Sequence, residues 1–182
     1  NGDKGKYIHV EVESAGFVNI DINVGNALVN MYCECGLISM VEQVFEELPL
    51  RDVISWTMLI SLYSSKPSSA LKALRYLDQM HLEGINPDAI TFVFCLKACG
   101  SIGNSYKGQE IYVKVVKEGH ENNVFVASAV VDMYAKCGLL IEAQAAFDKL
   151  EVRNVVSWGA LISGYVEWGF SRDALARWKA MM

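Results

Sequence analysis

Residues 26–37, NALVNMYCECGL, recur as SAVVDMYAKCGL at residues 128–139. The two stretches lie 102 residues apart, and the similarity extends beyond both of them. Without a gap, residues 24–56 and 126–158 share 14 identities in 33 positions. Two copies of one pattern in a chain of 182 residues indicate an internal repeat. An internal repeat indicates an architecture of similar units that stack on one another, whatever the structure of each unit.

The 102-residue repeat divides into shorter units. ISWTMLISLY at 54–63 resembles VSWGALISGY at 156–165, and both resemble AITFVFCLKA at 89–98. Units of 31, 36 and 35 residues in a fixed order account for the full repeat. The units begin near these residues: Ile22, Val53, Ala89, Val124 and Val155.

Each unit has the apolar spacing of two helices. In the first unit, Leu28, Met31, Tyr32 and Cys35 share one helical stripe, Gly36 is a suitable stop, and a second stripe follows at once. A hairpin of two such helices cannot bury its apolar face alone, so the hairpins must stack into a solenoid. We therefore predict an all-α solenoid of eleven helices without a sheet. Residues 7–13 alternate like a strand, yet they match 111–117 inside a predicted helix.

Composition and charge exclude several classes of protein. Hydrophobic residues make up 52% and only 3 prolines occur, which excludes a disordered chain. No apolar run approaches the ~18 residues of a membrane span, and the first residues do not resemble a targeting peptide. The net charge of −5 argues against nonspecific binding driven by phosphate contacts. Five cysteines, an odd number, fit a reducing compartment, and we expect no disulfide to be needed.

No pattern in the sequence predicts catalysis, a cofactor or a metal site. The triplet from His9 to Glu11 matches the first half of a zinc-deaminase signature, but the chain has no C-x-x-C to complete it. The cysteines lack partner pairs and histidines at the spacing of zinc ligands. Neither a nucleophile with a base nor a phosphate-binding glycine loop is present.

The repeated phrases resemble the plant PLS-class pentatricopeptide repeat. The phrases that carry the resemblance are NALVNMYCECG, DVISWTMLIS, GINPDAITF and NVVSWGALISGY. In that family S, P and L motifs alternate, and the repeats form a right-handed superhelix. The resemblance implies these units: 1–21 partial L motif, 22–52 S motif, 53–88 P motif, 89–123 L motif, 124–154 S motif and 155–182 truncated P motif. We expect the chain to be a piece of a longer array.

The resemblance also implies a function. Members of the family bind single-stranded RNA in chloroplasts or mitochondria, one base per repeat, and specify sites for RNA editing by recruited protein factors. Splicing and RNA stabilisation are alternatives to editing. The chloroplast is the preferred location, and no membrane or enzymatic role is implied. Unstacked bases offer their Watson–Crick edges to side chains in such repeat proteins.

Two residues of each motif contact the base in this family, the fifth and the last. The fifth residues here are Asn26, Thr57, Val93, Ser128 and Gly159. The last residues are Asp52, Asp88, Asn123 and Asn154. Asp21 ends the partial first motif, where one extra residue between Gly16 and Val24 shifts the alignment with the later units. The first pair resembles the combination for uracil, the second guanine and the fourth adenine, whereas Val93 offers no hydrogen bond. Repeats run parallel to the RNA, so the predicted site is 5′-U-G-N-A-3′.

Ordinary structural roles compete with these assignments. Asp and Asn are preferred helix N-caps, so capping alone accounts for the last residues, and turn preference is an alternative for the polar fifth residues. The second residue of each motif stacks between bases in the family, and packing between repeats is an equal alternative. The expected stacking residues are Ile54, Ile90, Phe125 and Val156, while Asn23 departs from the apolar pattern.

Lys136 is the candidate for a phosphate contact, although Glu34 stands at the equivalent position of the first S motif. A different class of function is a protein-binding scaffold or dimerisation module, because α-solenoids present concave surfaces to peptides and an acidic chain favours basic partners. Self-association through the cut ends of the array is a further expectation. RNA binding predicts polar fifth residues along one groove, whereas a scaffold predicts aromatic anchors there.

Overall fold

The computed structural model describes residues 2–14 and 21–182, and within these ranges every regular element is a helix. The prediction of eleven helices without a sheet is confirmed for these residues, and the strand-like residues 7–13 lie within the first helix. The helices are α1 (Gly2–Ser14), α2 (Ile22–Glu34), α3 (Ile38–Glu47), α4 (Val53–Ser64), α5 (Pro67–Leu82), α6 (Ala89–Ser101), α7 (Ser105–Lys117), α8 (Val124–Lys136), α9 (Leu140–Asp148), α10 (Val155–Glu167) and α11 (Ser171–Met181).

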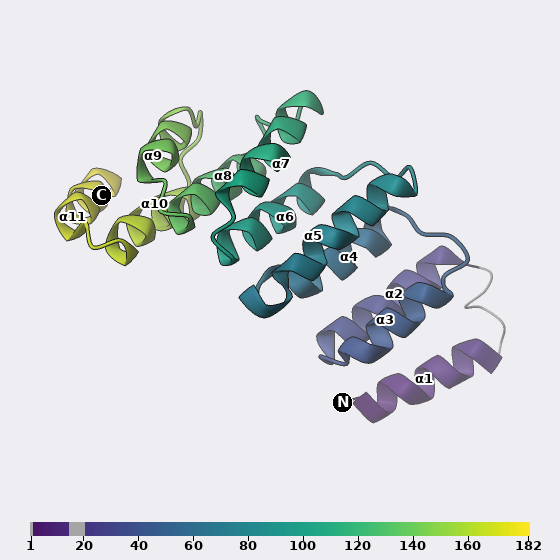
Figure 1. Ribbon diagram of the computed structural model, residues 1–182. Helices are drawn as coiled ribbons and strands as arrows, with labels where there is room; N and C mark the ends of the chain where they lie inside the picture. The colour runs from purple at the N-terminus through teal and green to yellow at the C-terminus, as the bar shows by residue number, and fades with distance from the viewer. Residues whose placement is uncertain (1, 15–20) are drawn as a thin grey trace.

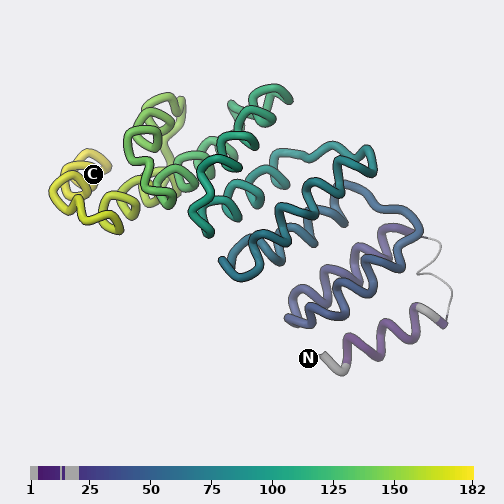
Figure 2. The backbone as a smooth tube through the Cα atoms, viewed as in Figure 1, coloured from purple at the N-terminus to yellow at the C-terminus, as the bar shows by residue number. Residues whose placement is uncertain are grey.

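The helices pair into hairpins that stack in chain order, and the two termini lie at opposite ends of the stack (Figure 1). The leading helices are α2, α4, α6, α8 and α10, and each of the first four contacts the next leading helix. The trailing helices α3, α5, α7 and α9 each contact the leading helix of their own hairpin and that of the next. The continuous path of the chain from hairpin to hairpin is that of a solenoid (Figure 2). Its buried apolar side chains form one connected cluster.

A helix begins at each of the five residues where the sequence places the start of a unit. A capping box starts α4, α6 and α10, with Asp52, Asp88 and Asn154 as the cap residues. In each box the side chain of the cap residue accepts a hydrogen bond from the backbone N–H three residues later. The side chain of that later residue accepts in return from the backbone N–H of the cap residue. Asp21 and Asn123 cap α2 and α8 by accepting from backbone N–H groups, without a capping box. The local sequence therefore determines where the leading helices start.

Glycines let the leading helices approach closely. A Cβ atom on Gly100 of α6 would lie 3.3 Å from the Cα atom of Met133 on α8. On Gly164 of α10 it would lie 2.6 Å from the Cβ atom of Ala135, also on α8. Larger side chains at these two positions would force the helices apart. Close packing of α6, α8 and α10 thus depends on two residues without side chains.

All five cysteines are free thiols, and two of them lie in the core on α6. Burial raises the pKa of Cys99 to about 12 and also raises that of Cys95, so both remain protonated and unreactive near neutral pH. These cysteines act as small apolar packing residues. Within residues 2–14 and 21–182, no helix combines the length and apolar character needed to cross a bilayer.

Candidate functional site

A groove of about 510 Å³ runs across the leading helices α6, α8 and α10. It is lined by residues from three consecutive units, which the chain separates by up to seventy positions. Seven of the predicted site residues line it: Val93, Phe125, Ser128, Lys136, Asn154, Val156 and Gly159. The solenoid therefore gathers in one groove the predicted site residues of its last three units other than Ile90 and Asn123.

Asn26 and Asp52 form the first pair of fifth and last residues. The Asn26 amide nitrogen donates long hydrogen bonds of 3.3 Å to both carboxylate oxygens of Asp52. The same carboxylate accepts from the backbone N–H of Ser55 at 2.9 Å and so caps α4. Asn26 is 8% exposed, and its amide oxygen is buried without a hydrogen-bond partner within the described residues. An unsatisfied buried acceptor of this kind is costly unless a ligand supplies a donor.

Thr57 and Asp88 come together through a third residue. The Thr57 hydroxyl oxygen lies 2.6 Å from the hydroxyl oxygen of Thr91, which in turn donates to the carboxylate of Asp88 at 2.8 Å. The carboxylate also accepts from the backbone N–H of Thr91 at 2.7 Å and caps α6. Thr91 is not apparent as a functional residue from the sequence, because a threonine three residues after a helix cap has an ordinary role in a capping box.

Ser128 and Asn154 form a direct pair. The Ser128 hydroxyl donates to the backbone carbonyl of Val124 at 2.7 Å and accepts a long hydrogen bond of 3.4 Å from the Asn154 amide. The amide oxygen of Asn154 accepts from the backbone N–H of Ser157 at 2.8 Å. Capping and pairing with the fifth residue thus coexist in Asp52 and Asn154, so the capping role leaves these side chains in contact with the fifth residue.

The remaining two fifth residues make no polar pair. Val93 is half-buried and packs against the core, while the Asn123 amide oxygen accepts only from backbone N–H groups at the start of α8. Gly159 is exposed, and a Cβ atom there would meet nothing within 4 Å. The groove is therefore open beside Gly159 and apolar beside Val93.

The four predicted stacking residues all reach solvent. Phe125 is 70% exposed, and the other three are between 56% and 65% exposed: Ile54, Ile90 and Val156. Side chains that pack between repeats would be buried, so their exposure disfavours that alternative. Exposed apolar side chains at the second place of these four units suit the stacking of flat, apolar ligand groups.

The charges of the groove differ from the sequence-based expectation. Lys136, the predicted phosphate contact, forms an ion pair of 2.7 Å with Asp132 one turn earlier on α8. Lys97 on α6 also lines the groove, and its ammonium group has no carboxylate partner among the residues the structure describes. Sequence analysis did not select Lys97, because no other unit has a lysine at its ninth position.

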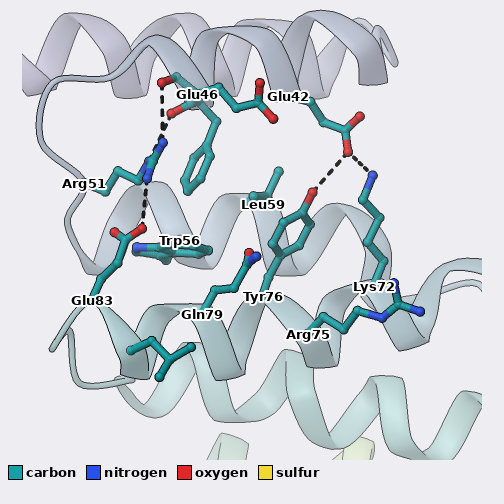
Figure 3. Close-up of a pocket in the computed structure, with 12 residues that line it drawn as sticks. Glu42, Glu46, Arg51, Trp56, Leu59, Lys72, Arg75, Tyr76, Gln79 and Glu83 are labelled. Carbon is teal, nitrogen blue, oxygen red and sulfur yellow. Dashed lines mark hydrogen bonds and ion pairs between the residues drawn. The ribbon is translucent and has the colours of Figure 1, made fainter.

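A second cavity, of about 560 Å³, lies between the trailing helices α3 and α5 (Figure 3). The Glu42 carboxylate accepts hydrogen bonds from Tyr63 at 2.6 Å, from Tyr76 at 3.1 Å and from Lys72. At the other end of the cavity Arg51 forms an ion pair of 2.9 Å with Glu83. Trp56 and Leu59 of α4 also line this cavity, whereas Thr57 of the same helix does not. The paired charges join two helices that have no close backbone contact, so this cavity is a structural junction.

Comparisons with known proteins agree with the repeat architecture. Residues 26–53, 125–155 and 156–182 match the family model described as PPR repeat. The chain is 40% identical over 172 residues to the Arabidopsis thaliana pentatricopeptide repeat-containing protein At4g18520, chloroplastic, covering 94% of this chain and 27% of that protein. It is 37% identical over 179 residues to the mitochondrial protein At3g24000 of the same plant, covering 98% of this chain and 28% of the relative.

A solved structure shares the fold. The crystal structure of the pentatricopeptide repeat protein PPR10 in complex with an 18-nt psaJ RNA element superposes with a TM-score of 0.76 at 20% sequence identity. The match covers 94% of this chain and 26% of that one. The chain thus spans about a quarter of the length of the proteins it resembles.

Proposed function

We propose that this chain, which contains pentatricopeptide repeats, binds single-stranded RNA in a plant organelle and contacts one base per repeat along its leading helices, of which α6, α8 and α10 line the groove. The observation that carries the proposal is the hydrogen bonding between the fifth and last residues of a unit at three junctions. The contact is direct at two of them and passes through Thr91 at the third, and exposed apolar residues suited to stacking lie at the second place of the neighbouring units. The chloroplastic and mitochondrial relatives support an organellar location. The RNA complex of PPR10 shows that this fold can accommodate an RNA strand.

The hydrogen-bonding groups at the first junction suit uracil. Asn26 uses its amide nitrogen on Asp52, which leaves its buried amide oxygen as the free acceptor. Uracil presents a ring N–H on its Watson–Crick edge, whereas cytosine and adenine present an unprotonated ring nitrogen there. An acceptor held by a carboxylate therefore favours uracil and guanine, which both carry a ring proton, over cytosine and adenine. Of these two bases, uracil is the one that the Asn26–Asp52 pair is proposed to select.

The groups at the fourth unit suit adenine. Asn154 has one amide proton left after its hydrogen bond to Ser128, and the Ser128 hydroxyl retains a lone pair after donating to Val124. One donor beside one acceptor complements the ring nitrogen and the exocyclic amine that adenine and cytosine share, and adenine is the one of the two that this pair is proposed to select. The second junction, Thr57 with Asp88, is proposed to select guanine.

The scaffold alternative receives less support. Phe125 is the only aromatic side chain among the described residues that line the groove, and the fifth residues beside it are small or polar. A peptide-binding concave surface would need several aromatic or large apolar anchors near its centre. We further propose that this chain selects the RNA site while recruited factors carry out the processing, with editing as the first process to test.

Fluorescence anisotropy with labelled oligonucleotides tests the proposal. The chain should bind an RNA containing 5′-U-G-N-A-3′ more tightly than a matched RNA in which the three specified bases are exchanged, and affinity should fall as salt rises. Each wrong base should cost roughly 1–3 kcal/mol, as for other base-edge contacts. Equal binding of both RNAs, or no binding at low salt and high protein concentration, would overturn RNA recognition.

A further inference from the structure

We propose that Thr91 determines the base specificity of the Thr57–Asp88 pair, because it fixes the direction of the Thr57 hydroxyl proton. Thr91 belongs to the following unit and is fully buried, so it is a positioning residue that does not touch the base. The inference rests on the proposed function. It assigns a specificity role to the third residue of a unit, in addition to the fifth and last residues, which contact the base.

The hydrogen-bond inventory around Thr91 leaves one arrangement. A hydroxyl group has one proton to donate and two lone pairs to accept with. A carboxylate only accepts, so the 2.8 Å contact between Thr91 and Asp88 uses the Thr91 proton. One lone pair of Thr91 receives the backbone N–H of Asp88 at 3.4 Å. The 2.6 Å contact with Thr57 can then be made only if Thr57 donates.

The consequence is that Thr57 faces the base as an acceptor alone. Its proton points toward the buried Thr91, and only its lone pairs remain for a ligand. Guanine presents a ring N–H and an amino group on its Watson–Crick edge, and both are donors. Adenine and cytosine present an unprotonated ring nitrogen, which would meet the lone pairs of Thr57 and be repelled. A hydroxyl free to rotate would accept either kind of base.

The other two junctions lack this arrangement and provide controls. Ser55 and Ser157 occupy the same third place, yet each donates its proton to the backbone carbonyl of the cap residue. Neither makes a hydrogen bond to the fifth residue of the preceding unit among the contacts that the structure describes. Removal of the Ser157 hydroxyl should therefore disturb the cap of α10 without changing a base preference.

Base analogues test the inference in the unaltered chain. RNA carrying inosine at the second base keeps the ring N–H, whereas 2-aminopurine keeps the amino group but has an unprotonated ring nitrogen. We expect inosine to bind within about threefold of guanine and 2-aminopurine about tenfold more weakly, the value of one base-edge contact. If the chain bound 2-aminopurine as tightly as inosine, the acceptor-only state of Thr57 would be wrong.

Variants then assign the effect to Thr91. Thr91→Val keeps the shape and frees the Thr57 proton, so the guanine-to-adenine affinity ratio should fall from about tenfold to below about threefold. Thr91→Ser should retain the wild-type ratio, and Ser157→Ala should leave the ratios at the second and fourth bases unchanged. Thermal unfolding followed by circular dichroism shows whether each variant is folded, and the analogue comparison decides the matter if Thr91→Val is not.

The outcomes separate this inference from the proposed function. If the wild-type chain shows no preference at any base, RNA recognition itself fails. If the wild type prefers guanine and Thr91→Val keeps the same ranking of the four bases, the proposed function stands and Thr91 has no role in specificity.

Discussion

The amide nitrogen of Asn26 lies 3.3 Å from both carboxylate oxygens of Asp52, and the same carboxylate caps helix α4. One side chain thus serves the fold and the proposed base contact together. Asp52→Ala should lower the free energy of unfolding by about 1 kcal/mol through loss of the cap, whereas Asp52→Ser should retain most of the stability. Both variants should lose the preference for uracil at the first base, because the Asn26 amide is no longer held.

Urea unfolding and binding to four oligonucleotides that differ at the first base separate the two roles of Asp52. A serine variant that is stable and still prefers uracil would show that Asp52 is a cap and nothing more.

Gly36 and Gly138 end equivalent helices with φ angles of 68° and 77°, but their surroundings differ. A Cβ atom on Gly138 would lie 2.8 Å from the indole of Trp168, which donates a 2.9 Å hydrogen bond to the Ala135 carbonyl. On Gly36 it would meet nothing within 4 Å. Gly36→Ala should cost about 1 kcal/mol of backbone strain, and Gly138→Ala roughly 2–3 kcal/mol, since the indole must also move. Chemical denaturation measures both, and equal losses would contradict the role given to Trp168.

The repeat predicts the fold well because its signals are local. The starts of the leading helices follow from Asp and Asn caps, several helix stops follow from glycines such as Gly36, and the apolar spacing predicts the remaining helices. Contacts between units could not be placed in this way. Thr91 looks like an ordinary capping residue until Thr57 is found 2.6 Å away. The division of the units into S, P and L types stays a prediction.

The charge pattern of the groove was also beyond sequence reasoning. Lys136 and Asp132 are one helical turn apart, and a lysine in that position can either bind its neighbour or reach into the groove. The structure pairs the two side chains. Lys97 lines the same groove because α6 packs against α8, and this contact between units cannot be read from the sequence.

Salt dependence of RNA affinity should distinguish the two lysines. Lys97→Ala should weaken binding to all sequences alike and reduce the slope of log affinity against log salt by about 0.7, the value for one phosphate contact on a single strand. Lys136→Ala should have a smaller effect, because Asp132 already neutralises that charge. Asp132→Asn should strengthen binding. Lys117→Ala on the trailing helix α7 is the matched control, and an equal effect there would mean that only net charge matters.

Acid should weaken the junction between α3 and α5. Burial raises the pKa of Glu42, but hydrogen bonds from Lys72, Tyr63 and Tyr76 outweigh it, so the pKa lies below its ordinary value of 4.5. A lowered pKa in the folded state stabilises the protein above the ordinary value, and that stabilisation disappears as the pH falls through the folded value. Glu42→Gln should therefore destabilise the chain at pH 7 and cease to matter well below pH 4.

Urea unfolding of Glu42→Gln and wild type at several pH values checks this expectation. Glu46→Gln is the control, because the Glu46 carboxylate lines the same cavity without a hydrogen-bond or ion-pair partner among the residues described. A difference between wild type and Glu42→Gln that stays constant with pH would contradict the role of the Glu42 charge.

The identity of the fifth residue should decide the preferred base. Thr57→Asn converts the Thr57–Asp88 pair into the Asn–Asp type found at the first junction, and Thr57 is only partly buried, so the larger side chain can extend toward solvent. The new amide would direct its nitrogen to the acceptors around Asp88 and present its oxygen to the base, as Asn26 does beside Asp52. Preference at the second base should move from guanine toward uracil, with a cost of roughly 1–3 kcal/mol for the base that no longer fits. Four oligonucleotides that differ only at the second base measure the ranking in wild type and variant, and thermal unfolding confirms that the helices remain packed. An unchanged ranking in a folded variant would exclude base recognition by this repeat and favour the protein-binding scaffold instead.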